Sequence, residues 1–443
     1  MLRMRSSLWI AAVLCINGTL GAQQSPDSLA RAQLRAQQRA LDSLAQAVRD
    51  IQSRFDSLQR VVATPPPPAP AAASGAYMNV SFVGLTSAGT TTADDIQSLE
   101  VGDHDPKVRG FSIPNGELSL DGAVDPYFKG FANIAYKLDA AGETGVELEE
   151  MFALSSALPL NLQLKIGQFF AEFGRQNNQH PHAWAFADQN LVLGRMFGRE
   201  GLRSQGARLS WLLPTSFYTE ASMAVMNSAG GTTSSFRSEE AGAIHGGVPI
   251  DRPVRGFGDM LFVPRVATSL DPTDNTTLVV GISGAFGPNN SGPTARTSLY
   301  GTDVYWKWKS PRAAKGFPFV SLQSEFLARA YDAAARPDAS APLTTLPAET
   351  LRDRGAYGQI LWGIRPMLVA GLRAEFVHAD PAFFLSDERT NRTRYSTDIT
   401  LFPTEYSKLR LQYNYDRRPG IGNDHSLWAQ FEFLLGAHAA HKF

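Results

Sequence analysis

The feature that most constrains this 443-residue chain is the alternation of polar and apolar side chains, which recurs in short stretches from residue 77 to residue 443. The stretch Asn161–Phe169 alternates in this way. Gly206–Leu213 repeats the pattern before Pro214, which cannot donate a hydrogen bond to a neighbouring strand. Each stretch predicts a β-strand with one polar and one apolar face. The chain from 77 to 443 is therefore expected to be all-β.

The breaks between these stretches are of two kinds, short ones that contain Pro or Gly and longer ones between them. Short and long connections are expected to alternate strictly, and a soluble β-sandwich has no reason to sort its connections in this way. A transmembrane antiparallel β-barrel of about sixteen strands does, because outer-membrane barrels have an even strand number, short periplasmic turns and longer external loops. The strands are expected to begin near residues 77, 115, 127, 145, 160, 203, 216, 259, 276, 299, 317, 354, 367, 393, 406 and 425.

The later stretches assign their side chains to two faces of such a barrel, and closure leaves no unpaired strand edge in hydrocarbon. The side chains expected to face lipid are Ile399, Leu401, Leu409, Leu411, Tyr413 and Tyr415. Those expected to face the interior are Asp398, Thr400, Lys408, Arg410, Gln412 and Asn414.

The last stretch, His425–Gly436, alternates cleanly, and the chain ends on Phe443, which resembles the assembly signal of outer-membrane proteins. The outward side chains of this stretch are expected to be Leu427, Phe431, Phe433 and Leu435. Amphipathic indole rings suit lipid-facing or interfacial positions. This role is expected for Trp211, Trp306 and Trp308.

Residues 1–22 have the layout of a secretory signal peptide, with Arg3 and Arg5, an apolar run, and small residues ending at Ala22. Cleavage after Ala22 is favoured over lipoprotein processing at Cys15, the one cysteine of the sequence. The mature protein then has no thiol. This excludes disulfides, zinc–cysteine sites and thiol nucleophiles.

Residues 23–63 are expected to form a periplasmic coiled coil, because two sets of seam positions recur every seven residues. The sets are Leu34, Leu41, Val48, Phe55 and Val62, and Ala30, Gln37, Leu44, Ile51 and Leu58. A self-associating coil predicts a homo-oligomer, with a trimer favoured; the alternative is a single amphipathic helix packed on its own domain. The Pro- and Ala-rich residues 64–76 are expected to be an extended linker before the barrel at 77–443.

Composition and charge exclude several classes of function. A net charge of −1 argues against a nucleic-acid partner, since neutralising phosphates needs a basic surface. After the signal peptide no stretch of about 18 residues is apolar enough for a transmembrane helix. Neither an enzyme nor a cofactor is expected, because no nucleophile–base pair or phosphate-binding glycine loop occurs at an informative spacing. Catalytic groups assembled only in three dimensions stay open, as does a soluble secreted all-β protein.

Two motifs carry a family resemblance. One is Lys165-Ile-Gly-Gln-Phe-Phe-Ala-Glu-Phe-Gly-Arg175, which leads into a long connection, and the other is Gly198-Arg-Glu-Gly-Leu202. With the signal peptide, coil, spacer and barrel, they make the chain resemble the phosphate-selective (O/P-type) porin group of bacterial outer-membrane β-barrels. The resemblance implies the barrel fold and passive diffusion of small hydrophilic solutes or ions. It does not extend to phosphate selectivity, because inward carboxylates offset inward cations: Glu147, Glu149, Asp398 and Glu432 against Lys129, Lys165, Arg208 and Arg410.

The connection from Glu172 to Glu200 is roughly thirty residues long, far more than a hairpin needs. By resemblance to general porins it is the third external loop, which folds inward and narrows the lumen. Opposed charges across such a gap would orient solutes and select ions. The expected pore constriction comprises Lys165, Glu172, Arg175, Asp188, Arg195, Arg199, Glu200 and Arg208. The alternative is that the loop charges pair with one another and stiffen the loop. Four aromatic rings are expected to pack on the inner wall: Phe173, Trp184, Phe186 and Phe197.

His180 and His182 lie in the same connection and support a metal-binding hypothesis, because imidazole is a common zinc ligand. Their spacing is not a zinc template, and His438 and His441 lie at the periplasmic end, so loop packing or solvation is the default interpretation. The expected location is the bacterial outer membrane, with the lipid bilayer as partner and the N-terminal segment in the periplasm. The alternative functions are a histidine-dependent divalent-metal binding or uptake barrel, and a structural anchor that contacts the cell wall through its coil.

Overall fold

The structure, a computed structural model, divides the chain into two units, Met1–Gly75 and Ala76–Phe443. The described residues all belong to the second unit: 78–138, 142–156, 158–238 and 242–436. The predicted signal peptide, coiled coil and linker lie outside them, and so do His438 and His441.

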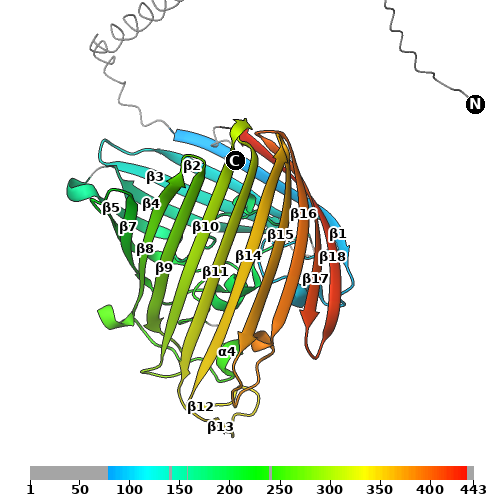
Figure 1. Ribbon diagram of the computed structural model, residues 1–443. Helices are drawn as coiled ribbons and strands as arrows, with labels where there is room; N and C mark the ends of the chain where they lie inside the picture. The colour runs from blue at the N-terminus through cyan, green and yellow to red at the C-terminus, as the bar shows by residue number, and fades with distance from the viewer. Residues whose placement is uncertain (1–77, 139–141, 157, 239–241, 437–443) are drawn as a thin grey trace, which may run out of the picture. The chain divides into compact units, whose positions relative to one another are not determined.

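Sixteen antiparallel strands close into one barrel (Figure 1). Strands adjacent in sequence pair with each other, and the first pairs with the last, with Ser81 opposite Gly436 and Thr91 opposite Ser426. The barrel strands are β1 (Met78–Thr91), β2 (Gly110–Ala123), β3 (Phe128–Leu138), β4 (Thr144–Ser155), β5 (Leu162–Phe170), β6 (Arg203–Leu212), β7 (Tyr218–Asn227), β8 (Met260–Thr273), β9 (Thr276–Pro288), β10 (Arg296–Ala314), β11 (Phe317–Ala333), β14 (Glu349–Arg365), β15 (Leu368–Ala379), β16 (Arg392–Thr404), β17 (Ser407–Arg418) and β18 (Gly422–Gly436).

Short elements occupy the connections at the end of the barrel away from the first and last described residues. Two very short strands, β12 (Arg336–Pro337) and β13 (Thr345–Leu346), pair with each other between β11 and β14. The helical elements are α2 (Ile96–Leu99), α3 (Leu191–Phe197) and α4 (Gly242–His245), with 3-10 turns η2 (Pro181–Ala183), η4 (Phe257–Asp259) and η5 (Asp387–Arg389); η1 (Pro159–Asn161) lies at the opposite end. Among the described residues, no helix is long and apolar enough to cross a membrane.

The predicted all-β class, strand number and closure are confirmed. The expected strand starts depart furthest at β2 and β14, which begin at Gly110 and Glu349 instead of near 115 and 354. The prediction that long and short connections alternate strictly is wrong at residues 419–421, which join β17 to β18 in a turn as tight as those at the other end. These two strands pair as far as Arg418 and Gly422, so no long loop is left between them.

The two faces of the barrel follow the alternation of the sequence. In β17 and β18 nearly every second residue is buried, and the residues between are exposed or half-exposed. All six side chains expected to face the interior in β16 and β17 are buried, and the six expected to face outward are exposed, except Tyr415, which is half-exposed. In β18, Leu427, Phe431 and Leu435 are exposed, and Phe433 is half-exposed. Because one residue of slip would exchange the faces, the register of these strands is as predicted.

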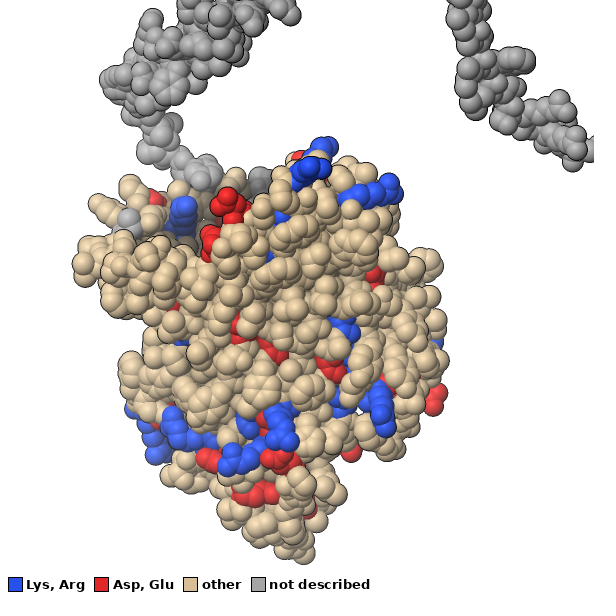
Figure 2. All heavy atoms as spheres, viewed as in Figure 1, with Lys and Arg blue, Asp and Glu red and all other residues tan. Residues whose placement is uncertain are grey.

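The outside of the barrel is apolar along most of its circumference. On the wall turned to the viewer in Figure 2, uncharged side chains prevail, and Lys and Arg gather mostly toward the ends of the strands. Exposed large apolar side chains occur on strands all around the ring, for example Val80, Met223, Val266, Ile282, Phe326, Ile360, Trp362, Leu372 and Ile399. Trp211 is exposed, and Trp306 and Trp308 are half-exposed.

The largest apolar core lies inside the barrel, between the β5–β6 connection and the wall. Its members from the connection and its flanks include Phe169, Phe173, Leu191, Val192, Met196 and Phe197. Those from the wall include Ala224, Met226, Leu261, Val263, Leu299 and Leu327. Apolar side chains therefore occupy part of the β7–β11 side of the interior.

The register of β18 predicts opposite effects at two neighbouring positions. Phe431 is 41% exposed on the outer face, so Phe431→Arg is expected to cost about 2–4 kcal/mol if the position lies near the middle of a bilayer. Gln430 is buried inside, accepts from Arg410 Nη1 at 3.1 Å and donates to the Ala187 carbonyl oxygen at 3.3 Å. Gln430→Glu keeps the first contact and loses the second, so it is expected to cost less than Phe431→Arg. Urea titration of the protein folded in lipid vesicles measures both. A larger loss for Gln430→Glu would show that the face assignment is inverted.

Candidate functional site

β4 contains a bulge that turns two neighbouring carboxylates toward the barrel interior. In the pairing with β3, Asn133 lies opposite Glu150, whereas the next residue, Ile134, lies opposite Leu148. Glu149 is therefore the extra residue of the bulged strand. Glu149 and Glu150 are both buried instead of alternating between the two faces.

The Gly-Gln pair at the end of β5 fits against this bulge. Gly167 has a φ of 143°, and a Cβ at this position would lie 2.1 Å from the carbonyl oxygen of Met151. Gln168 donates from Nε2 to the carbonyl oxygens of Leu148 and Glu149, at 2.5 and 3.2 Å. These bonds replace strand pairing, because β4 pairs with β5 from Met151 onward. The motif at 167–168 therefore supports the bulge.

The connection between β5 and β6, residues 171–202 (the β5–β6 loop), begins with contacts to the inner sides of β10 and β11. Gly174 has a φ of 64°, and a Cβ there would collide with the Glu325 carboxylate. The Arg175 guanidinium lies 3.9 Å from the centre of the Tyr305 ring, and the Gln176 N–H donates to Glu325 Oε1 at 2.8 Å. The Phe-Gly-Arg motif of the sequence thus brings the loop against β10 and β11.

The aromatic side chains of the β5–β6 loop are largely buried within the barrel. Phe173 and Phe197 pack edge to face, with ring centres 5.1 Å apart. Phe186 lies under the Arg373 guanidinium, 4.6 Å from ring centre to charge. Trp184 is half-buried. Burying each Phe contributes about 1.5–3 kcal/mol, which offsets part of the cost of ordering the loop.

Asp188 anchors the middle of the loop to the wall farthest from β5. It accepts from Arg373 at 2.5 Å, from Arg394 at 2.8 Å, from Gln412 at 2.9 Å and from Asn414 at 2.7 Å. Arg373 belongs to β15, which lies eight strand steps from β5 in the ring of sixteen. Burial raises the pKa of Asp188, but Arg373 and Arg394 outweigh burial and lower that pKa to about 2. The loop therefore reaches the opposite wall of the barrel, where the ionised carboxylate of Asp188 accepts hydrogen bonds from four side chains.

Two further contacts hold the loop in place. Arg195 of α3 pairs with Asp353 of β14 at 3.3 Å, and Asp353 also binds Arg329 and Arg389. The connection between β1 and β2 reaches the same interior, where Asp105 accepts from the Gln189 N–H at 2.7 Å. Two connections thus meet inside the barrel.

The eight residues expected at the constriction do not form one ring. Glu172 pairs with Arg208 and lies 3.7 Å from Lys165, so these three form one group near β5 and β6. Arg175, Asp188 and Arg195 bind separate parts of the wall, as described above, whereas Glu200 lies near β3 and Arg199 is exposed. Their role in a constriction stays a prediction.

His180 and His182 lie against carboxylates of β2 and β4. His180 Nδ1 lies 3.1 Å from Glu149 Oε2, and its Nε2 lies 3.0 Å from Glu150 Oε2. His182 Nδ1 lies 2.9 Å from Glu117 Oε2, and the two imidazole rings stack 5.8 Å apart. Burial lowers the pKa of His180, but Glu117, Glu149 and Glu150 outweigh burial and raise it well above the ordinary value. Two groups with metal-ligand geometry share Glu149: one with Glu117 and His180, the other with His104 and Glu200.

Sequence reasoning missed most of this cluster. Glu117 and His104 lie far from the loop in sequence, and nothing local links them to it. The adjacent pair Glu149 and Glu150, which interrupts an alternating strand, is the one local sign of the bulge.

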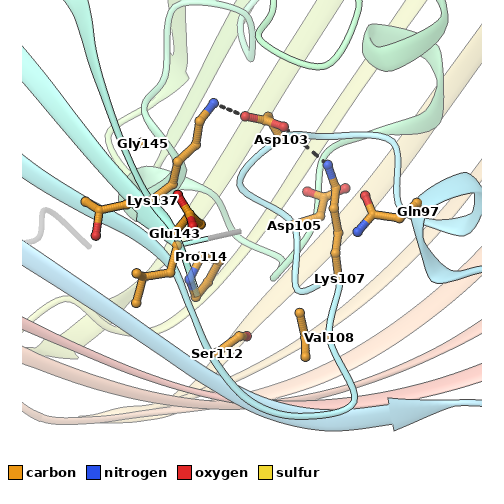
Figure 3. A pocket seen from close by; sticks show the side chains of 12 residues that line it. Gln97, Asp103, Asp105, Lys107, Val108, Ser112, Pro114, Lys137, Glu143 and Gly145 are labelled. Carbon is orange, nitrogen blue, oxygen red and sulfur yellow. Dashed lines mark hydrogen bonds and ion pairs between the residues drawn. The ribbon is translucent and has the colours of Figure 1, made fainter. Parts of the chain in front are cut away.

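A cavity of about 360 Å³ opens beside this cluster, between the β1–β2 connection and the ends of β2, β3 and β4 (Figure 3). Asp103 lies between Lys107, at 3.4 Å, and Lys137, with which it forms an ion pair. Lys137 also lies 2.9 Å from Glu200. The cavity is lined by charges of both signs.

The fold and this interior define the chain as a closed sixteen-strand β-barrel with a charged lumen and a long internal loop. No family model matches the sequence. An uncharacterized protein of Aquifex aeolicus (strain VF5) is 30% identical over 356 residues, covering 76% of this chain and 70% of that protein. The chain belongs to the same family as this Aquifex protein.

Several solved barrels are similar in shape. The outer membrane channel DcaP of Acinetobacter baumannii has a TM-score of 0.48 at 12% identity, over 81% of this chain and 97% of that chain. An anion-selective porin from Comamonas acidovorans has a TM-score of 0.49 at 7% identity, over 82% and 99%. Pseudomonas putida OprB has a TM-score of 0.48 at 12% identity, over 82% and 94%. Identities this low assign no residue of this chain a role.

Removing the Asp188 charge is expected to release the β5–β6 loop. Asp188→Asn leaves Arg373 and Arg394 buried with less compensation, at a cost of about 3–5 kcal/mol. Hydrogen exchange across residues 171–202 should accelerate, while the barrel strands stay protected. Because the pKa of Asp188 is lowered in the folded state, its stabilisation is complete above the unfolded value near 3.8 and is lost as the pH falls through about 2.

The matched control is Glu388→Gln, which removes an exposed carboxylate from η5. This variant should exchange at the wild-type rate. Equal protection of the loop in Asp188→Asn and Glu388→Gln would show that Asp188 is not its anchor.

Proposed function

We propose that this protein is a porin of the bacterial outer membrane, through which small hydrophilic solutes or ions diffuse passively. The observation that carries the proposal is the inversion of the two faces: large apolar side chains are exposed around the closed barrel, while charged side chains are buried inside it. Soluble proteins have the opposite arrangement. A closed sheet also pairs its strand N–H and C=O groups internally, as hydrocarbon requires.

In this proposal the β5–β6 loop narrows the lumen. Contacts of Arg175, Asp188 and Arg195 with β10, β15 and β14 support a loop that spans the interior. The apolar cluster closes part of the β7–β11 side, and the cavity that contains Asp103 and Lys137 opens at the β2–β4 wall, so solutes pass along that wall. Mixed charges along this route favour small polar solutes over apolar ones.

The remaining parts of the proposal concern assembly and location. The heptad seam of residues 23–63 would join the chains as a trimer in the periplasm and could contact the cell wall there. The resemblance to the phosphate-selective porin group extends to solute diffusion, and phosphate preference is not part of the proposal. A barrel that serves only as an anchor is the competing function.

Planar-bilayer recording of the full-length protein tests the porin function directly. Discrete conductance steps are expected, and replacing Phe173–Arg195 by a short Gly/Ser linker should raise the conductance several-fold, because most of the loop leaves the lumen. Circular dichroism and the gel shift of heated against unheated barrels verify folding. A folded wild-type protein without conductance would favour the anchor. Equal conductance of the two proteins would place the narrowest point elsewhere.

Two arginines of the loop are expected to differ in their effect on selectivity. Arg199 is exposed, so Arg199→Gln removes positive charge from the aqueous interior and should shift the reversal potential toward cations. Arg195 is paired with Asp353, so Arg195→Gln should lower the unfolding temperature with little change in reversal potential. Reversal potentials in a salt gradient measure both variants. A shift for Arg195→Gln alone would contradict the assignment.

A further inference from the structure

We propose that Glu117, Glu149, His180 and Asn133 form a binding site for one divalent transition-metal ion of the zinc class, on the inner wall of β2, β3 and β4. The site goes beyond the porin function and does not depend on whether the barrel conducts. It combines one imidazole with oxygen ligands, a set that suits Zn²⁺ and its neighbours in the first transition row.

The spacing of the four groups matches that of a metal coordination shell. His180 Nδ1 lies 3.1 Å from Glu149 Oε2 and 3.5 Å from Glu117 Oε2. The terminal amide atom of Asn133 lies 2.9 Å from His180 Nδ1, 2.9 Å from Glu149 Oε2 and 3.3 Å from Glu117 Oε2. Tetrahedral ligands at about 2.0–2.1 Å from Zn²⁺ are separated by about 3.3 Å. Once the Asn133 amide is turned so that its oxygen takes the place of its nitrogen, the four atoms surround a point that an ion can occupy.

Each of these atoms has a hydrogen-bond partner, but the Asn133 amide nitrogen and His180 Nδ1 lie in direct contact at 2.9 Å. The Asn133 amide nitrogen has two hydrogens but faces three acceptor positions, on Glu117, Glu149 and His180. If His180 Nδ1 carries a proton, it faces the amide N–H of Asn133. If Nδ1 carries no proton, its lone pair faces Glu149 Oε2 at 3.1 Å. Turning the Asn133 amide over lets its nitrogen donate to Ser119 Oγ, now 2.9 Å from the amide oxygen, and directs four lone pairs at the same point. A cation removes this conflict.

The surrounding groups are those that orient metal ligands. The bulge directs Glu149 to the imidazole Nδ1 and Glu150 to the Nε2 of the same ring, at 3.0 Å. A carboxylate on the distal nitrogen fixes the tautomer and makes the ligating nitrogen more basic. Asn115 donates to the other oxygen of Glu117 at 2.5 Å. A regular strand would send one of the two glutamates to the outer face, so the bulge is what builds the site.

The second group that shares Glu149 is a poorer cation site. Glu200 lies 2.9 Å from the Lys137 ammonium, and Glu149 Oε1 lies 4.0 Å from Arg203 Nη1. Two fixed positive charges next to the ligand atoms oppose a divalent cation at His104. The assigned site meets the interior through the His180 and His182 side chains, which are 14% and 11% exposed, whereas Glu117 and Glu149 are buried behind them.

Zn²⁺ binding to the full-length protein in detergent, prepared without a histidine tag and stripped with a chelator, tests the site. Isothermal titration calorimetry is expected to show one Zn²⁺ site in the wild-type protein. In Glu149→Gln and His180→Gln the affinity of this site for Zn²⁺ should be at least about 100-fold weaker than in wild type. Glu150→Gln should weaken binding by about 10–100-fold through the distal nitrogen. The matched control is Glu147→Gln, on the same strand but outside the ligand set, which should bind like wild type.

Two further measurements keep the test independent of variants that fail to fold. Asn133→Asp exchanges a neutral ligand for a carboxylate and should bind Zn²⁺ more tightly than wild type. Co²⁺ bound to the stripped wild-type protein should show the intense visible absorption of a tetrahedral site, absent in His180→Gln. The proposal is overturned if the stripped wild-type protein takes up no more Zn²⁺ than Glu149→Gln, or if Glu147→Gln loses binding equally. Because no current is recorded, these results are separate from those that test the porin function.

Discussion

The pairing of β1 with β18 is the constraint on which the rest of this structure depends. It leaves no strand edge, so the N–H and C=O groups of the barrel strands are hydrogen-bonded within the sheet itself. Once the ring is closed, alternation sends every second side chain inward. Sixteen strands enclose more space than their own side chains fill, and the interior must then be occupied by water, by solutes or by other parts of the chain.

The chain occupies that interior unequally. On the β7–β11 side the β5–β6 loop packs apolar side chains against an apolar wall, as Phe173 and Leu299 do in the same cluster. Toward β15 and β16 the loop supplies the carboxylate of Asp188, which pairs with Arg373 and Arg394. Without this partner, the burial of the two guanidinium groups would destabilise the protein. Near β2–β4 the contacts of the loop are mostly between charged side chains, and a cavity opens there. The two anchored sides therefore decide where the open side lies.

Much of the barrel could be predicted from the sequence, because the inside and outside of a strand differ at every second residue. The faces of Phe431 and Gln430 follow from local alternation alone. The interior site could not be predicted in the same way. His180 was recognisable as a metal candidate, but its partner Glu117 comes from β2, and the register and curvature of the whole ring bring the two together. The short turn at 419–421 could not be predicted either, since its length depends on how far β17 and β18 continue to pair.

The bulge of β4, where alternation fails, lies where the interior is chemically most distinctive. An extra residue in β4 carries an elastic and hydrogen-bonding cost, and the chain compensates with Gly167, which admits the close approach of β4, and with Gln168, which caps its carbonyl groups. A strand needed only for the wall would gain nothing from this arrangement. Its local effect is to place Glu149 and Glu150 on either side of one imidazole, beside the open part of the lumen. In the proposed metal site Glu149 binds the ion and Glu150 orients the imidazole, which gives the bulge a role beyond the wall.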